Sequence, residues 1–401
     1  MKQRSRLQIF VLIDALGWWL LEGRDFLDDW LPHRRPLRTV LGFSSGAIPT
    51  ILTGLPPATT GHWNLLYYDP QGSPFHWVRR FSFLPQSLMD HRITRRLVTE
   101  MGRRMLGMGP GFECCVSPRL LPWFNWVEKK NIYDRGGISG APSIFDQLGD
   151  QGVSFRVYSY HEASDAEILR RAESDLENSD ASFFFVYLCE MDMFLHLHCH
   201  EPSKIEEKLR WYKQGLERMF ELARRIDPDA RLTVTSDHGM APVQHHFDLL
   251  RELEPLGLKM PEDYLAVFDS TMARFWFFND RARRLVNDAF ADLPCGQWLT
   301  DENLKREGVF FSDRRFGEQI YLLNPSWLLS RSDFNGMGWM PSGMHGYHPD
   351  DSYSHAVFLA SHKPEREMYN IADVYLCMCE AAQIPHRGCS PALAGTTSEA
   401  H

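Results

Sequence analysis

Two adjacent side chains of ligand type, Asp237 and His238, give the strongest chemical signal in this chain. They follow residues 231–234, a short β-rich run with the pattern of a buried strand. A carboxylate and an imidazole together suit zinc or a similar divalent ion. Gly239 lets the backbone turn sharply behind them. The alternative at this point is that Asp237 caps the next helix beside a surface histidine.

A second pair of this kind, Asp192 and His196, follows the continuous apolar run of residues 182–188. Because the two residues are four apart, one helical turn places both on the same face. An Asp-x-x-x-His pair at the end of a strand favours metal binding over a purely structural histidine. His198 and His200 lie close by and crowd the same zone.

Two further candidates lie at opposite ends of the chain. Asp14 ends the apolar run of residues 9–13, which predicts the first central strand of a parallel sheet. The carboxyl end of such a strand is where α/β folds hold their ligands, although Asp14 could instead cap a helix over residues 18–21. Near the other end, His345 lies between Gly343 and Gly346, which permit a close approach of the backbone to a site. His348 is nearby and has a weaker case.

A pair of hydroxyls, Ser44 and Ser45, precedes an apolar segment that closes on Thr53-Gly54. Pro49 is tolerated only near a helix start, so we expect the helix to begin at or just after Ser45. A hydroxyl at a helix N-terminus lies where anions are favoured, which suits a nucleophile that attacks phosphorus. Either serine could instead be only an N-cap.

These residues need a scaffold, and the pattern of the chain predicts an α/β fold. Further strands are expected over residues 154–158 and 356–360, with a long amphipathic helix over 204–226 and a final helix over 371–382. Residues 64–150 and 241–340 interrupt this rhythm as two insertions. The first is rich in aromatic residues and contains a basic run over 92–104. It is expected to be half lid and half substrate wall, although the basic run could equally be a solvated helix face. The second includes plausible strands over residues 273–277 and 319–323.

Composition limits the classes of partner. The chain has 401 residues, 44% of them hydrophobic, and a net charge of −9, which disfavours broad binding to nucleic acid or anionic membranes. A local basic pocket could still receive a phosphate. The eight cysteines lack zinc-ribbon or CxxC spacing and indicate thiols in a reducing compartment. With no signal-peptide pattern and no apolar run of eighteen residues, we expect a cytoplasmic location and no membrane span.

The order of these motifs resembles the alkaline phosphatase superfamily, and within it the type I phosphodiesterase/nucleotide pyrophosphatase branch, over roughly residues 7–385. The resemblance implies one catalytic domain over residues 1–401. Its fold would be an alkaline-phosphatase-like α/β sandwich with a central, mostly parallel sheet flanked by helices. The insertions would form a cap at the carboxyl end of the strands.

The resemblance also implies two divalent metal ions, zinc first and manganese as the alternative. One set of ligands would be Asp14, Asp237 and His238, and the other Asp192, His196 and His345. The nucleophile, which also contacts metal, falls nine residues before Thr53, at Ser44. An asparagine that holds the phosphoryl oxygen falls at Leu65 in the same frame. Asn64, one residue away, is the candidate for substrate binding, and the alternative is that the support of the oxyanion differs from that of the branch. The chain departs from the branch in having serine for threonine and Ser45-Gly46-Ala47 for Phe-Pro-Asn.

We therefore expect a two-metal phosphate-ester hydrolase of the phosphodiesterase or nucleotide pyrophosphatase type, acting through a phosphoseryl intermediate. The alternatives are a phosphomonoesterase or phosphotransferase of a biosynthetic pathway, and a metal-dependent protein that binds a phosphorylated ligand without turnover. The expected substrate is a small phosphate ester or nucleotide-like molecule, and no binding to nucleic-acid duplexes is expected. The sequence leaves the oligomeric state open.

Overall fold

A six-stranded sheet forms the centre of the computed structural model, which describes residues 6–81, 83–108, 111–159, 163–333 and 340–386. Strands β7, β1, β6 and β5 are parallel to one another, and β16 is antiparallel to both of its neighbours, β7 and β2. Across the sheet the order is β2 (His33–Leu37), β16 (Ala356–Ala360), β7 (Arg231–Thr235), β1 (Gln8–Ile13), β6 (Phe183–Leu188) and β5 (Phe155–Tyr158).

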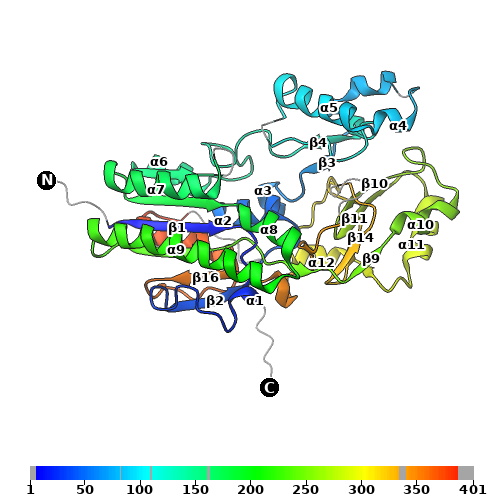
Figure 1. Cartoon of the computed structure of the whole chain (residues 1–401). Coiled ribbons are helices and arrows are strands. Elements are labelled where there is room, and N and C mark those ends of the chain that lie inside the picture. Colours follow the sequence, from blue (N-terminus) through cyan, green and yellow to red (C-terminus); the bar gives the residue numbers. More distant parts are fainter. Residues whose placement is uncertain (1–5, 82, 109–110, 160–162, 334–339, 387–401) are drawn as a thin grey trace.

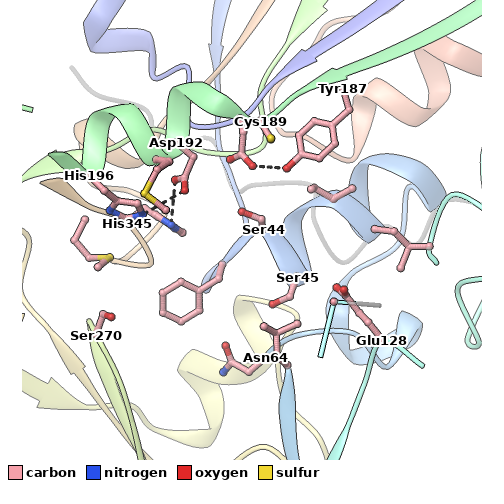
Figure 2. A pocket seen from close by; sticks show the side chains of 18 of the residues that line it. Ser44, Ser45, Asn64, Glu128, Tyr187, Cys189, Asp192, His196, Ser270 and His345 are labelled. Carbon is pink, nitrogen blue, oxygen red and sulfur yellow. Dashed lines mark hydrogen bonds and ion pairs between the residues drawn. The ribbon is translucent and has the colours of Figure 1, made fainter. Parts of the chain in front are cut away.

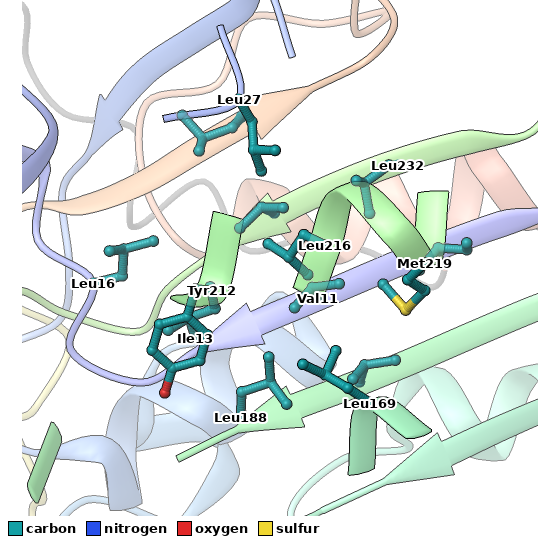
Figure 3. Close-up of a cluster of buried hydrophobic side chains, with 14 of the residues drawn as sticks. Val11, Ile13, Leu16, Leu27, Leu169, Leu188, Tyr212, Leu216, Met219 and Leu232 are labelled. Atoms are coloured by element: carbon teal, nitrogen blue, oxygen red, sulfur yellow. The ribbon is translucent and has the colours of Figure 1, made fainter. Parts of the chain in front are cut away.

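Helices cover both faces of this sheet, which explains why β1 and β6 are buried along their whole length and, apart from Gln8, lack strongly polar residues. On one face Val11 and Leu232 pack against Leu216 and Met219 of a long helix (Figure 3). Phe10 and Leu12, which alternate with Val11, pack on the other face. The first layer contains α1 (Trp18–Leu21), α7 (Asp165–Asn178), α8 (Glu190–His198) and α9 (Pro202–Ile226), and the second contains α2 (Ser44–Thr53), α6 (Ile144–Asp150) and α13 (Asp373–Ala382).

The two inserted segments pack on each other beyond one end of the sheet (Figure 1). Leu66 and Trp126 share a hydrophobic cluster with Leu265, Val267 and Trp276. The short helix α3 (Pro57–Thr60) lies just before the first segment. The segment itself contains β3 (Leu66–Tyr68), α4 (Gln86–Met89), α5 (Arg92–Met105) and β4 (Phe124–Trp126). The second contains β8 (Ala241–Pro242), β9 (His245–Phe247), α10 (Leu249–Leu253), β10 (Tyr264–Asp269), β11 (Met272–Phe277), α11 (Asp280–Phe290), β12 (Gly296–Trp298), α12 (Asp301–Arg306), β13 (Gln319–Leu323) and β14 (Trp327–Leu329), and β15 (Gly343–Met344) follows it.

The strands expected from continuous apolar runs are confirmed to within about one residue at each end. The edge strand β2 was missed because its sequence, HRRPL, is charged, contains proline and buries only Leu37, as an edge position allows. The division into one domain with two insertions stays a prediction, and residues 334–339 of the second insertion lie outside the described residues. Within the described ranges, no helix is both long and apolar enough to cross a bilayer.

Candidate active site

Three neighbouring parallel strands bring the acidic candidates to one edge of the sheet. β1 lies between β7 and β6, so the carboxyl ends of all three strands meet. Asp14 directly follows β1, and Asp237 follows β7 after one residue. Asp192 lies in the first turn of α8, which begins immediately beyond β6. His345 arrives from the far end of the chain, because β15 pairs with β8 just after the turn at residues 236–240.

The ligand-type atoms of these residues form two groups, in each of which the atoms lie within 4.8 Å of one another. The division is the one that the resemblance implied. The groups touch, since the rings of His238 and His345 stack with centroids 3.8 Å apart. One group is Asp14, Asp237 and His238, and the other is Asp192, His196 and His345.

Backbone carbonyls orient two of the histidines. His238 Nδ1 lies 2.9 Å from the carbonyl oxygen of Gly239, and His196 Nδ1 lies 2.8 Å from that of Gly343. Each Nδ1 therefore carries the proton and donates it, which leaves the Nε2 lone pair facing the carboxylates. His238 Nε2 is 3.3 Å from Asp237 Oδ2, and His196 Nε2 is 3.3 Å from Asp192 Oδ2. Metal-binding histidines are held in this way by a carbonyl on the second nitrogen.

The three carboxylates fit cations because each keeps one buried oxygen without a hydrogen-bond partner. Asp14 Oδ2 accepts from the Tyr187 hydroxyl, and Asp237 Oδ1 accepts from the amides of His238 at 3.0 Å and Ala15 at 3.2 Å. The remaining oxygens, Asp14 Oδ1, Asp192 Oδ1 and Asp237 Oδ2, have no such partner. Buried charged oxygens without partners are costly, and divalent cations would compensate them.

Burial and the close packing of charged side chains also shift the pKa values of the candidate ligands. Burial, together with the charges of Asp237 and Asp192, raises the pKa of Asp14 well above its usual range. Burial also opposes ionisation of Asp192, but the nearby His196 and His345 hold its pKa below its usual range. Burial, with His238 beside it, lowers the pKa of His345. Burial and the neighbouring negative charges thus oppose ionisation of Asp14, and bound cations would reverse that balance.

Ser44 and Ser45 occupy different surroundings. Ser44 is the first residue of α2, and its Oγ lies 3.0 Å from His238 Nε2. The Oγ of Ser45 instead donates to the carbonyl of Trp63 at 2.6 Å. The expected helix start at or after Ser45 is wrong by one residue, because the extended Phe43 serves as N-cap and its carbonyl accepts from the amides of residues 46 and 47. Neither serine caps the helix through its side chain.

A cavity of about 530 Å³ opens over this site. Ser44 lies at its centre, between Asp192 and His345 on one side and Tyr187 on the other (Figure 2). Asn64 and Glu128 belong to the opposite wall. Asn64 is buried, and its amide nitrogen lies 3.8 Å from the sulfur of Met272. No lysine or arginine is among the described residues that line the cavity, so the lining is not the local basic pocket that the sequence left open.

Three other histidines bind elsewhere, and the structure excludes the helix-cap alternatives for Asp14 and Asp237. His198 Nδ1 lies 2.6 Å from Glu201 Oε1, His200 Nε2 lies 2.9 Å from the carbonyl of Val243, and His348 Nε2 lies 3.7 Å from Glu307. None of the three belongs to either candidate metal group. Asp14 does not cap α1, whose N-cap is Gly17, and Asp237 is followed by a strand rather than a helix.

Three residues that position or line the site had no local signal in the sequence. Tyr187 is inside an apolar strand, so its bond to Asp14 could not be separated from core packing. Glu128 lies in an aromatic segment, and only the fold turns it into the cavity. Asp165, at the start of α7, accepts from the amides of Cys189 and Glu190 and so holds the beginning of α8.

Comparison with known proteins identifies the fold and the family. Human ectonucleotide pyrophosphatase/phosphodiesterase 5 has the same fold, with a TM-score of 0.68 and 15% identity over 96% of this chain and 97% of that one. The murine protein, solved as an inactive variant in complex with AMP, has a TM-score of 0.67 and 16% identity over 96% of this chain and 97% of that one. At such identities the likeness shows the fold, and it confirms the alkaline-phosphatase-like architecture.

Relatives by sequence include two phosphopentomutases. That of Anaeromyxobacter dehalogenans strain 2CP-C is 30% identical over 125 residues, which is 31% of this chain and 29% of the relative. That of Anaeromyxobacter sp. strain K is 30% identical over 125 residues, 31% of this chain and 30% of the relative. The match thus spans less than a third of these relatives. The model of the type I phosphodiesterase/nucleotide pyrophosphatase family matches residues 43–348, most of the chain. The chain therefore belongs to the type I phosphodiesterase/nucleotide pyrophosphatase family.

Proposed function

We propose that this protein is a metal-dependent phosphodiesterase that cleaves a small phosphate diester through a covalent phosphoseryl ester formed on Ser44. Membership of the family makes it an enzyme of phosphoryl transfer. The observation that carries the finer proposal is the position of Ser44. Its Oγ lies at the first turn of α2, 3.0 Å from His238 Nε2, in the floor of the cavity and beside both candidate metal groups.

The donor set supports zinc. Each site has three ligands, two carboxylates and one imidazole in the first and one carboxylate and two imidazoles in the second. Mixed nitrogen and oxygen ligands suit zinc, with manganese as the alternative. When bound, two such ions would favour ionisation of the Ser44 hydroxyl and would neutralise charge on the phosphoryl and leaving oxygens.

The chain's own residues define the remaining steps. Ser44 Oγ loses its proton to solvent and attacks phosphorus, the bond from phosphorus to the leaving oxygen breaks, and the leaving oxygen takes a proton from solvent. The intermediate is a phosphate diester of Ser44 that keeps the second ester group of the substrate. Water then attacks this phosphorus and gives up a proton, the bond between phosphorus and Oγ breaks, Ser44 regains a proton, and the phosphate monoester is released. The N-terminus of α2 favours the negative charge that develops beside it, and the Asn64 amide is available to donate to a phosphoryl oxygen.

The charge around the cavity favours a diester over a substrate with more charge. While the Ser44 hydroxyl is protonated, three ionised carboxylates and two divalent ions leave a net charge of about +1, which one diester anion balances. A monoester carries a second negative charge, and a pyrophosphate carries a further phosphate. The described residues that line the cavity include no lysine or arginine that could neutralise this additional charge. Glu128 adds an acid to the same wall.

A phosphotransferase is the second candidate, and the phosphopentomutase relatives favour it. The first step would be the same. The phosphoryl group would then pass from Ser44 to an acceptor hydroxyl rather than to water, so only the second step separates the two functions.

One set of assays tests both candidates. Purified protein supplied with zinc or manganese is given an aryl phosphate diester and the matching monoester, with and without an acceptor alcohol. We expect faster aryl release from the diester, an unchanged product in the presence of alcohol, and, after rapid acid quench, a phosphate that still carries the second ester group on the peptide containing Ser44. Transfer to the alcohol would establish the second candidate. Equal failure on all esters by metal-loaded protein would overturn both.

A further inference from the structure

An exposed apolar surface on α4, α5 and the turn before them has no partner in the described structure. Of the twelve most exposed large apolar side chains among the described residues, six lie between residues 81 and 105. Phe83 is 78% exposed, Met105 77%, Ile93 64% and Leu97 63%. Figure 1 shows α4 and α5 at an outer edge of the molecule, away from the main sheet. The six are Phe81, Phe83, Leu88, Ile93, Leu97 and Met105.

The spacing on α5 gives this helix two apolar faces. Val98 and Gly102 face inward, and Gly102 packs on the ring of Phe112. Ile93 and Leu97, one turn apart, lie on the outward face. The outward face of a solvated surface helix is polar. An outward pair of large aliphatic residues therefore indicates that this face binds an apolar partner, either a membrane or another protein surface.

The charge on this surface differs in sign from that of the rest of the molecule. Residues 79–105 contain seven arginines and two acidic residues, a balance of +5, whereas the whole chain carries −9. Arg79, Arg95 and Arg103 are engaged within the fold, by the Trp123 ring and by the carbonyls of residues 115 and 112. Among the described residues, no acidic side chain pairs with Arg80, Arg92 or Arg96.

We propose that this surface, which we call the arginine–apolar surface, docks on an anionic lipid bilayer. Exposed Phe, Ile, Leu and Met side chains would enter the boundary between headgroups and acyl chains, and the unpaired arginines would contact anionic headgroups. The chain's negative remainder would be repelled by the same lipids, which orients the molecule with this surface toward the bilayer. An interface with a second copy of the chain is disfavoured because it would bring the same arginines together, and like charges repel.

The test is sedimentation of the full-length protein with vesicles. We expect binding to vesicles of phosphatidylglycerol and phosphatidylcholine at low salt, release at high salt, and no binding to pure phosphatidylcholine. Each arginine at the surface contributes about fivefold to binding, so R92Q/R96Q is expected to bind roughly 25-fold more weakly. I93S/L97S, which removes the outward aliphatic pair, is expected to bind weakly at every salt concentration.

The matched control is R224Q/R225Q, which makes the same change in net charge at the exposed end of α9. It should bind like the parent, and all three variants should keep the parent's melting temperature and its rate on a soluble aryl ester. Equal binding by the parent and R92Q/R96Q, or no binding to anionic vesicles, would overturn the proposal. Concentration-dependent dimers that I93S/L97S abolishes, without vesicle binding, would assign the surface to a second copy and overturn it as well.

Discussion

At the scale of single residues, the two neighbouring serines separate cleanly. The Ser44 hydroxyl contacts His238, whereas the Ser45 hydroxyl donates a hydrogen bond to the carbonyl of Trp63. We predict that Ser44→Ala lowers turnover by about 10³-fold or more while both metal sites still fill, because the Asp and His ligands remain. Ser45→Ala should keep activity and lose about 1 kcal/mol of stability, the value of one hydrogen bond.

Turnover, metal content by elemental analysis and urea unfolding measure these three quantities together. An inactive Ser45→Ala beside an active Ser44→Ala would show that the alignment of the nucleophile is wrong by one residue. Activity in both variants would show that the covalent step does not occur.

Glu128 supplies a prediction on pH. Burial in the cavity wall raises the pKa of this carboxyl from 4.5 to about 7. Between these two values the folded protein keeps a proton that the unfolded chain has released, so the free energy of unfolding falls as pH rises from about 4.5 to 7. Glu128→Gln cannot ionise, and we expect it to be more stable than the parent above pH 7 and equal to it below pH 4.5.

The full pKa shift corresponds to about 3 kcal/mol, but the side chain is only partly buried beside an open cavity, so we expect about 1 kcal/mol. Urea unfolding of parent and variant at pH 5 and pH 8 measures it. A stability difference that is the same at both pH values would contradict the raised pKa of Glu128.

At the scale of elements, α8 determines one candidate metal group, because it carries both Asp192 and His196. The helix has no side-chain N-cap of its own. Its start is held from α7, where Asp165 accepts from the amides of Cys189 at 2.9 Å and Glu190 at 3.1 Å and also from the Tyr212 hydroxyl at 2.5 Å. Asp165 is therefore expected to position metal ligands that it does not touch.

We predict that Asp165→Ala lowers the free energy of unfolding by roughly 2–3 kcal/mol, since it leaves buried donors without an acceptor. Bound metal should fall from two ions toward one per chain, because only the Asp192 group depends on α8. Asp175→Asn is the control, as it alters an aspartate of α7 that also accepts from a tyrosine, Tyr158, away from the site. Two fully retained ions in Asp165→Ala would limit Asp165 to a structural role.

At the scale of the whole molecule, the candidate metal groups join parts of the chain that are far apart in sequence. The ends of β1, β6 and β7 and the segment after β15 all contribute ligands. Metal that binds only the folded state stabilises it by about 2.7 kcal/mol at a hundred times the dissociation constant. We predict that chelation lowers the melting temperature by several degrees, measured by calorimetry before and after metal is restored.

His345→Ala is the informative variant, since it removes the one ligand that comes from beyond the second inserted segment. Without chelator, the melting temperature of His345→Ala should already be lower than that of the parent. Chelation should then lower the melting temperature of the variant by less than it lowers that of the parent. If neither chelator nor added metal changed the melting temperature of the parent, the result would contradict a structural role for the ions.

The sequence by itself determined the strands and the residues that end them. Continuous apolar runs identified β1, β6 and β16, because strands covered on both faces need such runs wherever they lie in the fold, and a β-rich run identified β7. The same local reading put Asp14, Asp192 and Asp237 at the carboxyl ends of strands. Membership of the family and the type of chemistry followed from the order of those motifs.

Only the tertiary structure decided which of these residues meet and what surrounds them. The order of β7, β1 and β6, the arrival of His345 against α8, and the turn of Ser44 toward His238 depend on contacts between distant segments. Gly343 illustrates the reason. A side chain there would meet Cys199 and Leu195 of the region around α8 at 2.8 Å, a constraint that no residue near it in sequence encodes. Local patterns report which face of an element is buried, but the partner on that face is set by packing over the whole chain.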